Sequence, residues 1–263
     1  MLALLLGCGS AAVEDDCSTG VEQVWVMRSI EFARFEGDVA AGFDLDDDSG
    51  KVCGHDDWDS PWGGDGVDNN LARLIPALES TEAVAVESIV QDLINQGELL
   101  LMVEVRHLDD VQDDACIAAS VMRGQGPLEV GADDLLLPGQ TLDVSEVTPI
   151  ESAWTADSAI HGAGFPISLP FQVFEVQIPF ELESAQFRME VDPSDYIAQG
   201  VAGGAVPIQT VLDVVNDEDV DPELQDLANT LIPAMADMDF DGDGSCEAIS
   251  LAFHFEAVPV WVY

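Results

Sequence analysis

The most suggestive chemistry in this sequence lies in a short acidic loop near its C-terminal end. Asp239, Asp241 and Asp243 occupy every second position, Gly244 follows directly, and Glu247 comes three residues later. Carboxylates spaced in this way around a tight glycine turn can direct their oxygens toward one centre, and Ca²⁺ prefers such ligands. The spacing therefore predicts a calcium site. The alternative is an acidic turn that only caps the preceding helix.

This loop resembles the first half of an EF-hand calcium loop over nine residues. The resemblance implies five oxygen ligands: the carboxylates of Asp239, Asp241 and Asp243, the backbone carbonyl of Ser245, and Glu247 directly or through water. It departs at the twelfth position, where Ser250 replaces the bidentate Glu, and a strand pattern follows instead of a helix. Coordination therefore needs a further acid, either Asp237 or a distant one.

A second acidic segment repeats the spacing. Asp44, Asp46 and Asp48 alternate along the chain, with Ser49 where the EF-hand loop has glycine. Asp68 lies between a glycine-rich stretch and a helical pattern over residues 69–79. We predict a second calcium site from these four carboxylates. The alternatives are a solvated acidic loop and, for Asp68, a helix N-cap.

The charge balance limits the classes of partner. The 263 residues include 52 Asp and Glu but only 7 Lys and Arg, a formal net charge of −45. Such a surface repels nucleic acids and anionic lipid head groups. Because 48% of the residues are hydrophobic, the chain can still bury a core. The acidity suits a saline medium or bound divalent cations, and the alternative is a surface that serves solubility alone.

The N-terminal segment ends an apolar run at Leu6-Gly7-Cys8. This resembles a bacterial lipobox, which implies that Cys8 is lipidated; the alternative is an ordinary cleaved signal peptide. We assign residues 1–8 to the signal, 9–20 to a tether and 21–263 to a single domain. Because Gly9 is not Asp, the resemblance implies an outer-membrane or cell-surface location, with the periplasmic side as the alternative.

Segment 42–73 and the strand after Cys246 are similar to an uncharacterised family of exported lipoproteins of myxobacterial type. The resemblance implies export and a single domain, and no activity. Apart from Cys8, four scattered cysteines remain, and an even number in an exported chain predicts two disulfides. The three possible pairings stay open, as does a set of free thiols, for Cys17, Cys53, Cys116 and Cys246.

Hydrophobic periodicity predicts an α+β fold, a single domain rich in antiparallel sheet with three to four helices packed on one side or end. Alternation predicts strands over 21–35, 98–106, 115–123, 141–147, 154–160, 174–182, 185–191 and 247–262. Glu183-Ser184 is expected to join the two clearest of them. Helices are expected over 69–79, 82–96 and 207–215, and from Asp221 onward.

Catalytic motifs are absent from the sequence, and its four histidines are scattered. We therefore expect no enzyme but an exported, lipid-anchored, calcium-stabilised acidic surface protein with a binding or structural role, its protein or glycan partner unspecified. The alternative is a calcium-dependent secreted hydrolase or a carbohydrate-binding module. If exposed, Trp58 and Trp62 could stack on a sugar ring; if buried, they would hold the acidic loop in place.

Overall fold

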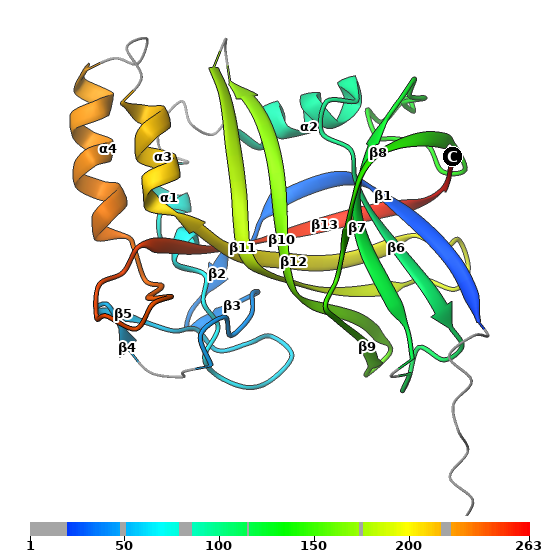
Figure 1. Ribbon diagram of the computed structural model, residues 1–263, viewed down its shortest axis with the longest axis horizontal. Helices are drawn as coiled ribbons and strands as arrows, with labels where there is room; N and C mark the ends of the chain where they lie inside the picture. Colours follow the sequence, from blue (N-terminus) through cyan, green and yellow to red (C-terminus); the bar gives the residue numbers. More distant parts are fainter. Residues whose placement is uncertain (1–19, 48–50, 79–85, 115, 174–175, 217–221) are drawn as a thin grey trace, which may run out of the picture.

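Strands dominate the fold, and few helices accompany them (Figure 1). The computed structural model describes residues 20–47, 51–78, 86–114, 116–173, 176–216 and 222–263, so Cys8, Cys17 and Asp48 lie outside the described residues. Within these ranges, three helices exceed one turn: α2 (Val86–Gln96), α3 (Ile208–Val215) and α4 (Pro222–Ala234). The one-turn α1 (Ile75–Leu78) follows the 3-10 helix η1 (Asn70–Arg73). The predicted three to four helices are confirmed only in part.

One nine-stranded mixed sheet organises the chain. In order across the sheet, its strands are β1 (Val21–Phe32), β6 (Leu101–Leu108), β7 (Ala118–Gln125), β8 (Thr141–Pro149), β13 (Ala248–Val262), β12 (Ala198–Pro207), β11 (Val176–Val191), β10 (Ala159–Val173) and β9 (Ser152–Ala156). Two short ribbons lie outside it: β2 (Phe35–Glu36) with β3 (Val39–Ala40), and β4 (Lys51–Val52) with β5 (His55–Asp56).

Strand β13 also pairs with β1, which closes β1, β6, β7, β8 and β13 into a ring. A ring with an odd number of strands cannot alternate in direction all the way around, so at least one neighbouring pair must be parallel. That pair is β8 with β13, where Thr141 lies opposite Trp261. Fully buried side chains of the ring, such as Val26, Met102 and Leu142, share a hydrophobic cluster with Ile94 of α2.

Helix α2 follows its sequence pattern closely. Its apolar residues Val90, Leu93 and Ile94 are buried in the main core. It ends before Gly97, whose φ of 80° is the left-handed conformation that a glycine C′ residue provides. In contrast, α3 and α4 lie together at one end of the molecule (gold and orange in Figure 1).

The expected hairpin at Glu183-Ser184 is wrong, because β11 runs without a break through these residues. Ser184 has a φ of 51°, and the pairing with β12 shifts register between Glu183 and Gln186. A bulge of this kind adds one residue and restarts the alternation of faces, so one bent strand resembles two in sequence. The strand expected over 154–160 is also wrong, because β9 and β10 meet at a turn formed by Asp157 and Ser158.

Strand β12, which lies between β11 and β13, was not predicted because its glycines weaken the apolar pattern. Gly200 shows why they are there. A Cβ at this position would lie 2.3 Å from the carbonyl oxygen of Arg188 and 2.6 Å from the Phe255 ring. The glycine therefore allows β12 to lie close to both neighbouring strands.

We predict that Gly200→Ala lowers the free energy of unfolding by about 1–3 kcal/mol, because backbone and an aromatic ring must move to admit the methyl group. Urea unfolding measures the loss. Gly124→Ala is the matched control, since its new Cβ would meet the flexible tip of Met102 at 3.1 Å. It should cost clearly less, and an equal loss in the two variants would contradict the explanation.

Candidate functional site

A layer of acidic loops covers one face of the sheet at the end of the molecule that carries α1. This acidic layer comprises residues 33–47 and 51–70, including β2–β5 (Figure 1). Ala33 and Ala41 pack on Val201 of β12 and Ala252 of β13, and the Ala33 N–H donates to the Ala252 carbonyl over 3.0 Å. The sheet thus holds the base of the layer, and its loops carry the aspartates.

Three of the four predicted carboxylates of the first cluster come together. One oxygen each from Asp44, Asp46 and Asp68 lies within 4.8 Å of the others, a spacing that could hold a metal ion. Asp68 is only 4% exposed, and its Oδ2 accepts the N–H of Leu45 at 2.7 Å. One side of the cluster, at Asp68, is therefore buried, while the exposed Asp44 faces solvent.

Asp68 is the electrostatic centre of this cluster. Burial raises the pKa of its carboxyl from 3.8 to about 8, and the Asp46, Asp57 and Asp237 carboxylates raise it as well. The hydrogen bond from Leu45 lowers this pKa, but not enough to offset burial. At neutral pH without a cation, Asp68 therefore retains a proton. A bound divalent cation would replace that proton and offset the neighbouring negative charges.

The second cluster contains Asp239, Asp241 and Glu247, again with ligand atoms within 4.8 Å of one another. The two oxygens of Asp239 accept the N–H groups of Gly242 and Gly244, both at 2.8 Å. These bonds fold the loop around Asp239, as the spacing of the sequence suggests.

Two other predicted ligands of this loop lie outside the carboxylate cluster. Asp243 uses its Oδ1 to accept the N–H of Ser245 at 2.8 Å. The backbone carbonyl of Ser245, which the EF-hand resemblance implies as a ligand, stays a prediction. As expected, a strand follows the loop, beginning at Ala248.

Asp237 does not join the second cluster. Its Oδ1 accepts the Ser250 N–H at 2.8 Å, and its Oδ2 accepts the Ser250 hydroxyl. Ser250 in turn accepts the N–H of Asn70 at 2.8 Å. Burial raises the pKa of Asp237. Ser250, at the twelfth position of the loop, therefore helps to anchor η1 and β13 to one another.

A disulfide joins the two acidic loops. Cys53, in the turn between β4 and β5, is bonded to Cys246, beside Glu247, with their Cα atoms 6.1 Å apart. The His55 ring lies 3.1 Å from the Ala234 carbonyl, and Asn70 Nδ2 donates to Met235 at 2.7 Å. Cys116 is also disulfide-bonded. The pairing that the sequence left open is thus settled for Cys53 and Cys246.

The two tryptophans of the acidic layer have different environments. Trp58 is 7% exposed, stacks on Phe35 with centroids 4.7 Å apart, and has the Arg73 guanidinium over its ring. It holds the layer together, as the buried alternative expected. Trp62 is 42% exposed. It belongs to the Trp62 loop (residues 58–67), which is closed by two backbone hydrogen bonds of 3.0 Å between Trp58 and Val67.

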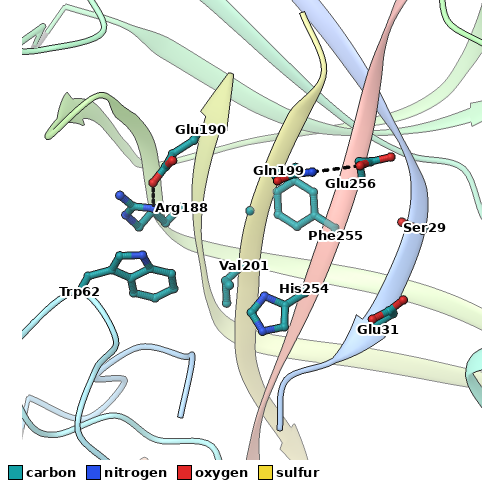
Figure 2. Close-up of a pocket in the computed structure, with 11 residues that line it drawn as sticks. Ser29, Glu31, Trp62, Arg188, Glu190, Gln199, Val201, His254, Phe255 and Glu256 are labelled. Carbon is teal, nitrogen blue, oxygen red and sulfur yellow. Dashed lines mark hydrogen bonds and ion pairs between the residues drawn. The ribbon is translucent and has the colours of Figure 1, made fainter. Parts of the chain in front are cut away.

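Where the acidic layer ends, the sheet face opens into a groove of about 340 Å³ (Figure 2). Strand register places two rows of side chains along its floor and walls. One row is Arg188, Val201, His254 and Glu31. The next is Glu190, Gln199, Glu256 and Ser29.

Figure 2 shows Trp62 and Arg188 on one side of this groove and Glu31 on the other, with Val201 and His254 between them. The Arg188 guanidinium lies 4.8 Å from the centroid of the Trp62 ring and pairs with Glu190 at 2.5 Å. Burial lowers the pKa of His254, which favours its neutral form.

Sequence reasoning missed the groove, apart from Trp62. The alternation along β11 indicates that Arg188 and Glu190 share its polar face, but four strands must be aligned before these residues meet His254 and Glu31. No single segment of the sequence contains that alignment. The exposed His254 points outward from the last strand into the groove.

No protein-family model, curated protein or solved structure matches this chain. Among the described residues, none of the helices is sufficiently long and apolar to span a membrane.

We predict that the effect of Asp68→Asn on the free energy of unfolding has opposite signs in chelator and in calcium. In EDTA, wild-type stability should fall from about pH 4 to about pH 8, because the folded state keeps a proton on Asp68 that the unfolded chain releases. The variant should flatten this slope and unfold at higher urea concentration than wild type at pH 8. In Ca²⁺ it should gain less stability than wild type, because it lacks a ligand charge.

Urea titrations at pH 5 and pH 8 in about 1 M NaCl measure both effects, since salt then screens the exposed charges. Asp65→Asn is the matched control, an exposed acid in the same layer. It should keep the wild-type slope. A wild-type slope that Asp68→Asn leaves unchanged would show that this carboxyl is already ionised in the folded protein.

Proposed function

We propose that this chain is an exported, acidic surface protein that Ca²⁺ stabilises and that has a non-enzymatic binding role. The observation that carries the proposal is the carboxylate cluster around the buried Asp68. This residue lies within reach of Asp44 and Asp46 and is surrounded by further acids. A divalent cation is the simplest partner for such a group, and the second cluster at Asp239, Asp241 and Glu247 offers another site.

Calcium would act here as a structural ion. It would offset the repulsion that otherwise forces the acidic loops apart, and it would stabilise the folded state by mass action because the unfolded chain lacks the assembled clusters. The Cys53–Cys246 disulfide joins the two acidic loops covalently beside the proposed sites.

The proposed location rests on the sequence. The run that ends at Cys8 resembles a lipobox, from which we propose lipid anchoring at the outer membrane or cell surface. A disulfide between Cys53 and Cys246 suits an oxidising compartment outside the cytosol. The high acidity suits a saline medium, where the Debye length falls to about 3 Å at 1 M salt.

A second candidate function, a carbohydrate-binding module, is favoured by one observation. Trp62 is exposed at the side of a groove that also contains carboxylate, guanidinium and amide groups. Trp58 does not take part, because it is buried beneath the acidic layer.

We predict that about 5 mM Ca²⁺ raises the thermal midpoint of the chain by several degrees relative to EDTA, in about 1 M NaCl. A site with Kd of roughly 0.1 mM gains about 2 kcal/mol under these conditions. Equal Mg²⁺ should give a smaller shift, because Mg²⁺ demands a tighter octahedral site. Asp44→Asn/Asp46→Asn and Asp239→Asn/Asp241→Asn should each lose part of the calcium gain.

Differential scanning calorimetry measures these midpoints. Glu181→Gln/Glu183→Gln is the control, because it also removes two negative charges, from exposed positions on β11. That variant should keep the full calcium gain. Equal midpoints in Ca²⁺, Mg²⁺ and EDTA would show that both clusters are solvated surface groups and would contradict the calcium proposal.

A further inference from the structure

We propose that the groove between Trp62 and Glu31 binds a neutral, polyhydroxylated ring, the chemistry of a sugar unit, with Trp62 as its stacking surface. This inference rests on the proposed binding role and gives that role a ligand class. It is carried by the register of four strands, by the exposure of Trp62 and by the charge balance of the lining residues.

The two side-chain rows of the groove offer both hydrogen-bond donors and hydrogen-bond acceptors. Arg188 and Gln199 supply N–H groups, while Glu31, Glu190 and Glu256 supply carboxylate oxygens. A ring hydroxyl both donates and accepts, so it can bond to either kind of group. Val201 and Phe255 also line the groove, but their side chains are buried, so Trp62 supplies the exposed apolar surface that suits the C–H face of such a ring.

The Trp62 indole has its own partner in Arg188, whose guanidinium lies 4.8 Å from the ring centroid. The backbone N–H of Trp62 donates to the Ser60 hydroxyl oxygen at 3.2 Å, and this hydrogen bond helps to fix the tip of the loop. The indole borders the groove and remains 42% exposed. An aromatic surface held in this way can pack against a ring without a large loss of side-chain freedom.

The charges of the groove favour a neutral ligand over an ion. Glu190 pairs with Arg188, and Glu256 accepts from both Arg28 and Gln199. A cationic ligand that approached Trp62 would meet the Arg188 guanidinium at the same ring. An anionic ligand would meet Glu31 and a chain with a net charge of −45. A neutral ring avoids both penalties.

The size of the groove sets the length of the ligand. Its volume of about 340 Å³ lies near the lower end of the usual range for small-molecule sites, about 300–1,000 Å³. That volume suits one or two rings rather than a long segment. The groove lies on the sheet surface, so a longer chain can continue beyond it.

The Trp62 loop also connects the groove to the first carboxylate cluster. Asp68 follows Val67, one of the two residues that close the loop, and the Asp68 N–H donates to the Phe43 carbonyl at 2.8 Å. A cation at Asp44, Asp46 and Asp68 would therefore hold the base of the loop whose tip carries Trp62. We expect sugar binding to be stronger in Ca²⁺ than in EDTA.

Ligand-observed NMR tests the inference with neutral trisaccharides of glucose, mannose, galactose, xylose and N-acetylglucosamine, and with tetramethylammonium and arginine amide as cationic probes. The full chain is measured in about 1 M NaCl with about 5 mM Ca²⁺. At least one trisaccharide should bind, and Trp62→Ala should weaken it roughly tenfold. Trp261→Ala is the control, because Trp261 is a 70% exposed tryptophan where β13 pairs with β8.

Glu31→Ala provides a second variant from the opposite wall, should Trp62→Ala disturb the loop, and it should also weaken the trisaccharide. Binding of none of the trisaccharides, binding of the cations alone, or equal affinity in wild type, Trp62→Ala and Glu31→Ala would overturn the inference. Repeating the titration in EDTA separates it from the calcium proposal. If the chain binds sugar but Ca²⁺ does not raise its thermal midpoint, the sugar-binding inference holds and the calcium proposal fails.

Discussion

Carboxylates held within 4.8 Å of one another repel strongly, and the two acidic loops concentrate that repulsion in two small clusters. At an effective dielectric constant of about 20, each ionised pair at this separation costs roughly 3 kcal/mol. Three pairs in one cluster therefore approach the whole stability of a typical domain, about 5–15 kcal/mol. A proton or a bound cation would relieve this repulsion. Asp68, with a pKa of about 8, shows the first solution, and a divalent cation would provide the second.

The chain has few positive side chains with which to relieve this repulsion, and five of them form ion pairs with acids that belong to neither cluster. Arg28, Arg34, Arg106, Arg123 and Arg188 each form an ion pair, and in every one of these pairs the acid is a glutamate on the sheet or on α2. The loops are instead held by the Cys53–Cys246 disulfide and by Asn70, which connects η1 to Met235 and Ser250. Covalent and hydrogen-bonded connections thus maintain an arrangement of charges that electrostatics alone would disperse.

The elements that could be predicted from sequence are those whose pattern is local. Helix α2 was predicted from its apolar periodicity. Strand β13 was predicted from the alternation of its apolar residues, of which Leu251, Phe253 and Phe255 are buried. The alternate spacing identified Asp44, Asp46, Asp239 and Asp241 as cluster members, whereas Asp243, predicted with them, lies outside its cluster. The continuous β11 was not predicted, because the bulge at Ser184 breaks the two-residue period. The groove was not predicted either, since its two rows exist only after β1, β11, β12 and β13 have paired.

Strand β13 connects these features, because its outward side chains meet three different environments in succession. Ser250 is buried against Asp237, Ala252 is buried beneath Ala33 and Ala41, and His254 and Glu256 line the groove beyond the layer. Its inward side chains face the hydrophobic core throughout. The two-residue period of one strand therefore sets the positions of the acidic layer and of the groove relative to each other. The acidic layer that carries Trp62 contacts Ser250 and Ala252, on the same strand that places His254 in the groove.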